Sequence, residues 1–305
     1  MISLGIESTA DNLGVGIVSS DEVLANNIKI YTPPEGGIHP REAARHHSEY
    51  MGYVIKKALE EADVTIGDVD IISFAQGPGL GPCLRTGATG ARALATYFKK
   101  PLIGVNHCVA HVEIGRMTTG AVDPLTLYVS GGNTLISGYE SGKYRIFGET
   151  LDISVGNCLD TFARAAGLEY PGGADIERHA RLGERLIPLP YVVKGMDLSY
   201  SGLLTTITSL LESGEYSVND LCFSLQEWAY AMLAEITERA LAHTGKPELL
   251  LTGGVAANKR LGGIIKDIAE YHDAIPYIIP GSLAQDNGAM IACLGYYKYI
   301  NLYFI

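Results

Sequence analysis

The sequence lacks several features that would mark particular classes of protein. No uninterrupted apolar run approaches the roughly 18 residues that a membrane span requires, and the start MISLGIEST has neither the basic segment nor the long apolar run of a signal peptide. The five cysteines are scattered and form no C-x-x-C pair, so neither a disulfide framework nor a thiolate zinc site is indicated. We expect reduced thiols and a cytoplasmic location.

Basic residues are also in short supply. The chain has 23 Lys and Arg against 34 Asp and Glu, which gives a formal net charge of −11. A protein that grips nucleic acid by itself normally shows a basic surface, because neutralised phosphates supply most of the non-specific affinity. This chain would therefore need partners to hold an RNA.

What the sequence does contain is ample apolar material in a repeated pattern. Its 305 residues are 47% hydrophobic, which suffices for one large domain or two. Residues 2–30 read as three strands joined by turns, and residues 125–150 repeat that rhythm around Ser-Gly-Gly-Asn. We predict two related lobes, residues 1–122 and 123–305, with a last helix that can pack back on the first lobe.

Helices and buried strands are predicted after each meander. In the first half the helical segments are residues 42–62 and 85–98, and the strands are residues 69–77 and 101–105. In the second half the helical segments are residues 155–167, 220–245, 256–272 and 287–297, and the strand is residues 248–254. This alternation predicts an α/β fold with mixed sheets.

Four segments could offer free backbone amides to a phosphate, because small residues follow a strand there. They are residues 5–14, 75–87, 128–134 and 249–261. A single Gly-rich turn is more often only a tight turn. Two such loops in two related lobes are more persuasive, since they could grip a nucleotide from both sides.

Two histidines four residues apart, in the stretch NHCVAHVE, raise the question of a metal. On a helix, His107 and His111 share one face and can close on one ion, although such a pair is more often two ordinary helix residues. The metalloprotease pattern places a glutamate directly after the first histidine as general base. Cys108 stands there instead, which disfavours peptide hydrolysis.

A third ligand has to come from elsewhere in the chain. Asp286 in AQDNGAM directly precedes a predicted helix, where an aspartate is most often an N-cap. Two imidazoles and one carboxylate with open positions would suit ferrous iron, with zinc or manganese as alternatives. If Asp286 is that ligand, the ion is held from both predicted lobes.

Two further segments have simple structural interpretations. Asp160 and Arg164 stand at i and i+4 and are typical of a surface ion pair. Residues 39–47, HPREAARHH, could form a basic contact patch, but a loop entering a solvated helix explains them better.

Nine sequence blocks in fixed order point to one family. They are GIEST, GGIHPREAARHH, QGPGLGPCLRTGATGARALA, NHCVAHVE, YVSGGNT, VGNCLDTFARAAGLEYPGG, LSYSGL, LTGGVAAN and AQDNGAM. Over nearly the whole chain, this series closely resembles the tRNA N6-adenosine threonylcarbamoyltransferase family. Its archaeal members are the catalytic subunit of the KEOPS complex, and the family was once described as an O-sialoglycoprotein endopeptidase.

The resemblance implies a two-domain actin-like (ASKHA) fold of duplicated ribonuclease-H-like domains with an interdomain nucleotide cleft. It implies transfer of threonylcarbamoyl from threonylcarbamoyl-AMP to the exocyclic amine of the adenosine next to the anticodon in ANN-decoding tRNAs. The implied cofactors are one divalent metal, with Fe²⁺ as the favoured ion, and an ATP or AMP-type nucleotide. The implied partners are a small dimerising subunit on the N-terminal lobe, a kinase-like subunit on the C-terminal lobe, and tRNA held through the complex.

The family's motifs also assign residues. The implied metal ligands are His107, His111, Asp286 and, as in archaeal members, Tyr128. The implied nucleotide or substrate contacts are Tyr128, Val129, Ser130, Gly131, Gly132, Asp160, Gly173, Glu177 and Asn258. No residue stands out as the general base, and Glu7 and Asp11 are the candidates. Asp11 departs from archaeal relatives, which commonly carry a histidine there, so the charge balance at the metal can differ.

Other classes of function stay open from the residues alone. An ATP-dependent small-molecule kinase of the actin-like fold would share the two-lobed cleft but would not require the histidine pair. A nucleotide-switched scaffold would bind its partners in an ATP-dependent way without any transfer chemistry. Bound iron together with absent phosphoryl transfer would argue against the kinase.

Overall fold

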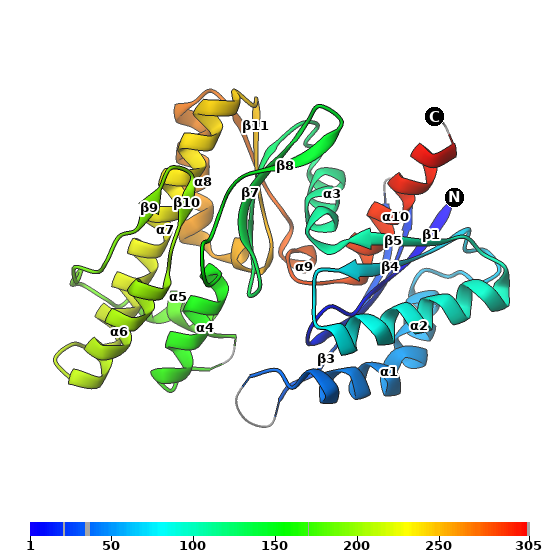
Figure 1. The fold of residues 1–305 in the computed structure, drawn as a ribbon, viewed down its shortest axis with the longest axis horizontal. Coiled ribbons are helices and arrows are strands. Elements are labelled where there is room, and N and C mark those ends of the chain that lie inside the picture. Colours follow the sequence, from blue (N-terminus) through cyan, green and yellow to red (C-terminus); the bar gives the residue numbers. More distant parts are fainter. Residues whose placement is uncertain (21, 34–36, 170, 304–305) are drawn as a thin grey trace. The chain divides into compact units, whose positions relative to one another are not determined.

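The computed structural model describes residues 1–20, 22–33, 37–169 and 171–303, except for the side chains of the last two. The chain forms two compact units (Figure 1), of which unit 1 comprises Met1–Gly120 with Gln285–Ile305 and unit 2 comprises Ala121–Ala284. The predicted boundary between residues 122 and 123 lies two residues from the start of unit 2. The predicted second lobe ran to residue 305, with a last helix that can pack back on the first lobe, and the last segment of the chain does group with unit 1.

Unit 1 is built on a five-stranded mixed sheet. Its strand order is β3 (Glu22–Ile30), β2 (Asn12–Ser19), β1 (Ile2–Glu7), β4 (Ile71–Gly77) and β5 (Leu102–Asn106). The three strands of the meander pair antiparallel, and β1, β4 and β5 pair parallel. The helices of this unit are α1 (Pro40–Glu61), α2 (Gly81–Phe98), α3 (His107–Thr119) and α10 (Gly288–Tyr303).

Alternation along β1 and β2 explains why helices cover both faces of this sheet. Leu4, Ile6, Val15 and Ile17 join a buried cluster that includes apolar residues of α1 and α2. The residues between them on β2 are glycines, and a Cβ on Gly16 would lie only 2.1 Å from the backbone nitrogen of Ala289 in α10. Because successive side chains of a strand point to opposite faces, α10 packs on the face opposite α1 and α2.

Unit 2 repeats the same sheet. Its strand order, read from the meander edge, is β8 (Lys143–Glu149), β7 (Thr134–Glu140), β6 (Leu125–Val129), β11 (Glu248–Thr252) and β12 (Ile275–Ile278). The meander is again antiparallel and the remaining pairings parallel. Both predicted meanders are therefore confirmed, and the two sheets share one connectivity, as the repeated rhythm predicted.

Helices and short elements complete unit 2. They are α4 (Val155–Ala165), α5 (Gly172–Ala180), α6 (Ser201–Ser213), α7 (Val218–Thr244), η1 (Gly254–Ala257), α8 (Lys259–Tyr271), α9 (Gly281–Ala284) and the two-stranded sheet of β9 (Val193–Lys194) and β10 (Asp197–Leu198). The strand β12 and the helices α5 and α6 were not predicted. Among the described residues, none of the helices combines the length and the apolar character needed to cross a membrane.

Candidate metal centre

The histidine pair lies at the start of α3, directly after β5. Asn106 ends β5 and caps the helix, because its side-chain oxygen accepts the backbone N–H of Val109 at 3.1 Å. His107 is the first helical residue and His111 follows one turn later, so their rings lie 4.9 Å apart between centroids. Both side chains are buried, with His107 4% and His111 0% exposed. This pair is therefore not a solvated helix face.

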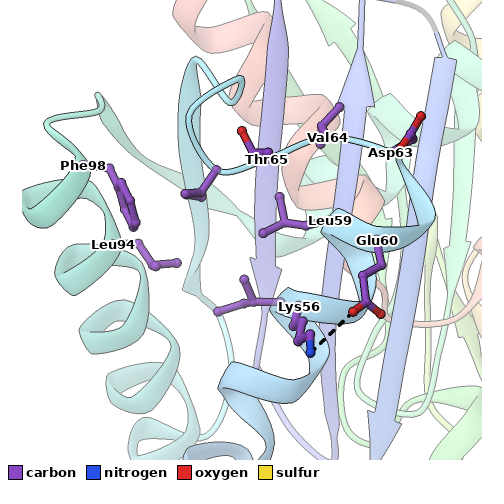
Figure 2. Close-up of a pocket in the computed structure, with 10 residues that line it drawn as sticks. Lys56, Leu59, Glu60, Asp63, Val64, Thr65, Leu94 and Phe98 are labelled. Atoms are coloured by element: carbon purple, nitrogen blue, oxygen red, sulfur yellow. Dashed lines mark ion pairs between the residues drawn. The ribbon is translucent and has the colours of Figure 1, made fainter.

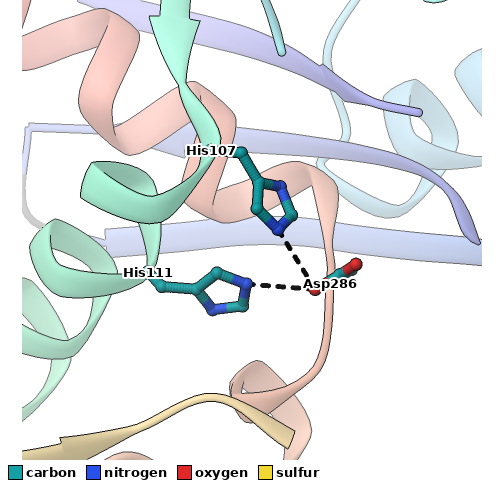
Figure 3. Close-up of side chains that lie close together, drawn as sticks. All are labelled: His107, His111 and Asp286. Carbon is teal, nitrogen blue, oxygen red and sulfur yellow. Dashed lines mark hydrogen bonds and ion pairs between the residues drawn. The ribbon is translucent and has the colours of Figure 1, made fainter. Parts of the chain in front are cut away.

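Asp286 reaches both imidazoles from the loop before α10 (Figure 3). Its Oδ1 atom lies 3.0 Å from Nε2 of His111 and 3.5 Å from Nε2 of His107. Asp286 does not cap α10, because the neighbouring Asn287 accepts the backbone N–H of Met290 at 3.0 Å. One potential ligand atom from each of His107, His111 and Asp286 lies within 4.8 Å of the others.

All three residues of this cluster belong to unit 1. The expectation that a metal would be held from both lobes is therefore wrong for these three side chains. The reason is the close packing of α10 on the glycines of β2, which returns the end of the chain to the first sheet.

Charge and burial act in opposite directions within the cluster. Burial opposes the charged form of His107, but the carboxylates of Glu7 and Asp286 outweigh it and raise the pKa of His107 well above its usual value. Burial lowers the pKa of His111. For Asp286, burial would raise the pKa, but the two histidines outweigh this effect and lower it far below its usual value. The carboxylates of Glu7 and Asp286 thus favour positive charge at His107.

Glu7 contacts the cluster through the Nδ1 side of the His107 ring. This residue ends β1 and is completely buried, and its Oε2 atom lies 3.0 Å from Nδ1 of His107. Its other oxygen accepts the backbone N–H of Thr9 at 2.6 Å. The other candidate base, Asp11, is half-buried just before β2. The structure therefore brings Glu7 into contact with His107.

The donor set fits a divalent transition metal. The Nδ1 atom of His107 faces Glu7, which leaves Nε2 directed at Asp286, and His111 also presents Nε2 to the same carboxylate oxygen. Two imidazole nitrogens and one carboxylate, with further positions open, suit Fe²⁺ and also Zn²⁺ or Mn²⁺. The two imidazole nitrogens argue against Ca²⁺, which takes six to eight oxygen ligands.

The predicted nucleotide loop lies in unit 2. Tyr128 and Val129 are buried at the end of β6, and the turn Ser130–Gly132 follows. The Ser130 hydroxyl oxygen accepts the backbone N–H groups of Gly132 at 3.3 Å and Asn133 at 3.0 Å, while the Ser154 hydroxyl donates to the carbonyl of Gly131 at 2.5 Å. The loop is thus fixed by its own hydrogen bonds, and the roles of Tyr128 as metal ligand and of this loop as nucleotide contact stay predictions.

The remaining predicted contacts also lie in unit 2. Asp160 on α4 accepts the backbone N–H of Gly172 at 2.9 Å, next to Gly173 in the first turn of α5, and burial raises the pKa of Asp160. This carboxylate therefore holds the start of α5. Glu177 on α5 accepts the backbone N–H of Lys259 at 3.4 Å.

Asn258 caps α8. Its oxygen accepts the backbone N–H of Leu261 at 3.0 Å, and its amide donates to Gln226 at 3.1 Å. Asp160, Glu177 and Asn258 thus each have a structural partner, and their contacts with a nucleotide stay predictions.

Sequence reasoning missed two buried residues, of which Asn12 contacts the cluster directly. Asn12 donates its side-chain amide to the backbone carbonyl of Asp286 at 3.4 Å. His47 is fully buried, and its Nε2 lies 3.0 Å from the carbonyl oxygen of Ala10. His47 belongs to HPREAARHH, which was interpreted as a loop and a solvated helix start. For His47 that interpretation is wrong, and the signal that could have found it was the block's place in the family pattern.

A separate concave surface lies between the C-terminal ends of α1 and α2 (Figure 2). This groove has a volume of about 440 Å³ and is lined by Ile55, Lys56, Leu59, Glu60, Asp63, Val64, Thr65, Ile66, Leu94 and Phe98. Its wall is mainly apolar, and an ion pair between Lys56 and Glu60 at 3.6 Å lies at one side. Tyr97, 80% exposed, packs its ring 4.8 Å from that of Phe98. We name this surface the α1/α2 groove.

Comparison with known proteins gives close relatives. The family model described as TsaD, tRNA N6-adenosine threonylcarbamoyltransferase, matches residues 22–293. A curated tRNA N6-adenosine threonylcarbamoyltransferase of Thermococcus sibiricus is 56% identical over 295 residues, which cover 97% of this chain and 91% of the relative. A probable bifunctional tRNA threonylcarbamoyladenosine biosynthesis protein of Methanocaldococcus jannaschii is 58% identical over 296 residues, which cover 97% of this chain and 55% of that longer relative.

Solved structures of low sequence identity share the fold. HypF of T. kodakarensis matches with a TM-score of 0.66 at 14% identity, covering 97% of this chain and 48% of that one. Component A of the (R)-2-hydroxyglutaryl-CoA dehydratase of Acidaminococcus fermentans matches with a TM-score of 0.60 at 14% identity, covering 98% of each chain. A ROK hexokinase of Thermus thermophilus matches with a TM-score of 0.53 at 14% identity, covering 99% of this chain and 100% of that one. These likenesses confirm the predicted actin-like (ASKHA) fold and say nothing further about the chemistry.

Proposed function

The chain belongs to the tRNA N6-adenosine threonylcarbamoyltransferase family, and we propose that it transfers threonylcarbamoyl from threonylcarbamoyl-AMP to the exocyclic amine of the adenosine next to the anticodon in ANN-decoding tRNAs. Beyond the family match, the observation that carries the proposal is the convergence of His107, His111 and Asp286 on one point. The cluster brings together segments that lie far apart in the sequence. Two ordinary histidines on a helix face would not need a carboxylate from such a distant segment.

One divalent ion, with Fe²⁺ as the favoured metal, would be held by His107, His111 and Asp286. Tyr128 would be a further ligand. When bound, such an ion supplies Lewis-acid stabilisation to the phosphate and carbamoyl oxygens of a mixed anhydride and to the charge that grows on the leaving AMP. The burial of His107 and His111 supports this role, because an electrostatic interaction is stronger where water is excluded.

The chain's own residues would then act mainly by positioning. In the transfer, the adenine nitrogen bonds to the carbamoyl carbon, the bond from that carbon to the phosphate oxygen of AMP breaks, and the amine loses a proton. An adenine amine is a poor nucleophile and gains most from being held close to the carbon it attacks. Of the two candidate bases we favour Asp11 as the acceptor of that proton, because Asp11 is half-buried whereas Glu7 is completely buried.

The AMP part of the substrate, or an ATP molecule, would be bound by residues of unit 2. We assign this role to Ser130, Gly131 and Gly132 after β6. Two hydrogen bonds already fix this loop: the Ser154 hydroxyl donates to the carbonyl of Gly131, and the Ser130 hydroxyl oxygen accepts the backbone N–H of Asn133. Residues Tyr128, Val129, Asp160, Gly173, Glu177 and Asn258 would complete the contacts. A loop fixed before binding loses less conformational entropy when the ligand arrives.

The chain would work in the cytoplasm within a KEOPS-type complex. Its net charge of −11 supports the idea that tRNA is held chiefly by other subunits. We propose that the small dimerising subunit docks at the α1/α2 groove, where the wall is apolar and Tyr97 is exposed, and that the kinase-like subunit docks on unit 2. A mainly apolar concavity beside an exposed aromatic residue is typical of a protein interface.

The test is transfer by the complete complex. In His107→Ala and His111→Ala, turnover from threonylcarbamoyl-AMP to tRNA should fall at least about 100-fold. Loss of a residue that only hydrogen-bonds to a metal ligand already costs about 10- to 100-fold in metal affinity or activity. His243→Ala, an exposed histidine of α7, is the matched control and should retain normal turnover. Near-normal turnover in both site variants would remove the metal from the proposal.

A further inference from the structure

The contact between Glu7 and His107 is unusual because the carboxylate has no access to solvent. Glu7 is 0% exposed, and each of its two oxygens already has a donor. One is the backbone N–H of Thr9 at 2.6 Å and the other is Nδ1 of His107 at 3.0 Å. A buried carboxylate is costly unless it is hydrogen-bonded and paired, so both contacts are needed where it lies.

This contact fixes which nitrogen of His107 carries a proton. A carboxylate can only accept hydrogen bonds, so Nδ1 of His107 has to be the donor. In the neutral imidazole, the form that can bind an ion, Nε2 is then the nitrogen without a proton, and that atom points at Asp286 at 3.5 Å. The Thr9 hydroxyl, at 3.5 Å from the same Nδ1, is a more distant partner.

The geometry also argues against Glu7 as the general base. A base has to come within about 3 Å of the proton it removes. Both oxygens of Glu7 are occupied, and His107 stands between this carboxylate and Asp286.

We infer that Glu7 is a positioning residue, which holds His107 in the Nδ1–H tautomer and aims its Nε2 at the ion. The inference rests on the proposed metal site and assigns a role that differs from the base for which Glu7 was a candidate. Carboxylates that accept the distal N–H of a ligating histidine orient the ring and raise its basicity, and their loss typically weakens metal binding about 10- to 100-fold.

Substitution by glutamine turns this arrangement into a sharp test. The backbone N–H of Thr9 is a fixed donor, so the amide oxygen of a glutamine has to face Thr9. Its NH₂ group then faces Nδ1 of His107, which can accept that hydrogen bond only if the ring proton moves to Nε2. In Glu7→Gln, therefore, the side chain keeps its size but the nitrogen meant for the ion becomes protonated.

The experiment is a titration of the metal-free full chain with Co²⁺, followed through the visible absorption bands that report coordination geometry. Glu7→Gln should bind Co²⁺ about 10- to 100-fold more weakly than wild type and show changed band positions or intensities. Glu7→Asp keeps an acceptor-only group one methylene shorter, so it should lose less affinity than Glu7→Gln. Glu248→Gln is the matched control, because Glu248 is a buried carboxylate of unit 2 that accepts the N–H groups of Val122 and Asp123 at 2.8 and 2.7 Å.

The outcomes separate this inference from the proposed function. If wild type binds Co²⁺ and Glu7→Gln binds it with the same affinity and spectrum, the positioning role is refuted while the metal site stands; lost transfer activity in that case would point to a base. If wild type shows no site that depends on His111, the metal proposal fails and this inference with it. Should Glu7→Gln not fold, Glu7→Asp decides: weaker Co²⁺ binding by the folded variant supports the role, and unchanged binding refutes it.

Discussion

Gly16 on β2 and Gly288 at the start of α10 are in backbone contact. A Cβ built on Gly288 would lie 2.1 Å from the backbone nitrogen of Gly16, and one built on Gly16 would lie 2.1 Å from that of Ala289. No side chain, not even a methyl group, fits at either position. Because Asp286 stands two residues before Gly288, the same contact sets the position of that carboxylate beside His107 and His111.

The first prediction concerns this contact. Gly288→Ala should destabilise unit 1 by about 1–3 kcal/mol, since the methyl group has to push rigid backbone aside, and it should weaken metal binding by shifting Asp286. Thermal unfolding and a Co²⁺ titration measure the two effects. Gly52→Ala is the control, because a Cβ there meets nothing within 4 Å on the exposed side of α1. Equal stability of both variants would contradict the packing argument.

A second prediction tests the α1/α2 groove as the docking site of the small partner subunit. Tyr97→Ala should weaken that association by roughly 2 kcal/mol, about 30-fold in Kd, as for an aromatic hot spot. The melting temperature should hardly change, because Tyr97 is 80% exposed. Titration calorimetry with the purified partner measures the effect.

Unit 2 supplies a closely matched control for this test. Tyr271 is 79% exposed and packs against its neighbour His272 with ring centroids 5.2 Å apart, much as Tyr97 packs against Phe98. Tyr271→Ala should leave the association intact. Equal weakening by both variants would mean that the groove is not the specific site.

The sequence predicted the local structure well where one segment contains the whole signal. The alternation in residues 2–30 was enough for the meander β1–β2–β3, because strand periodicity is local. The spacing of His107 and His111 likewise placed both on one side of a helix. The helix α3 then begins at His107 itself, since Asn106 provides the cap.

The part that could not be predicted depends on contacts between distant segments. The pattern GVGIV in β2 gives no sign that Gly16 receives a helix from the other end of the chain. Asp286 was therefore assigned to the second lobe, although it lies with the two histidines in unit 1. The strand β12 was missed because it has only four residues and contains Pro276, which weakens any local strand signal.

A third prediction concerns metal removal. Chelation should lower the melting temperature of the chain, because the ion joins α3 to the loop before α10. It should leave the far-ultraviolet circular dichroism unchanged, because these two segments of unit 1 are also packed together without the ion. At free metal about 100-fold above its Kd, binding adds about 2.7 kcal/mol of stability. Calorimetry with and without chelator measures this difference. His111→Ala should show no such shift, and an equal shift in that variant would place the bound ion elsewhere.

The last prediction concerns acid stability in unit 2, where Asp152 links two loops. Its carboxylate accepts the backbone N–H groups of Ile153 at 2.7 Å, Tyr200 at 2.9 Å and Ser201 at 3.2 Å, and it also accepts the Ser199 hydroxyl. Burial would raise the pKa of Asp152, but these hydrogen bonds outweigh it and lower the pKa from 3.8 to about 2.

A folded-state pKa below the unfolded value means that the folded state favours the ionised carboxylate. This stabilisation is complete above the unfolded pKa of 3.8 and disappears as the pH falls through about 2. Asp152→Asn should therefore be less stable than wild type at neutral pH, and the difference should shrink across that acid range. Urea unfolding followed by the fluorescence of Trp228, the single tryptophan, reports on unit 2 alone. Asp267 is an exposed carboxylate of α8, and the control Asp267→Asn should match the stability of wild type at every pH. If the stability difference between Asp152→Asn and wild type stayed constant down to pH 2, the hydrogen bonds of Asp152 would not depend on its charge.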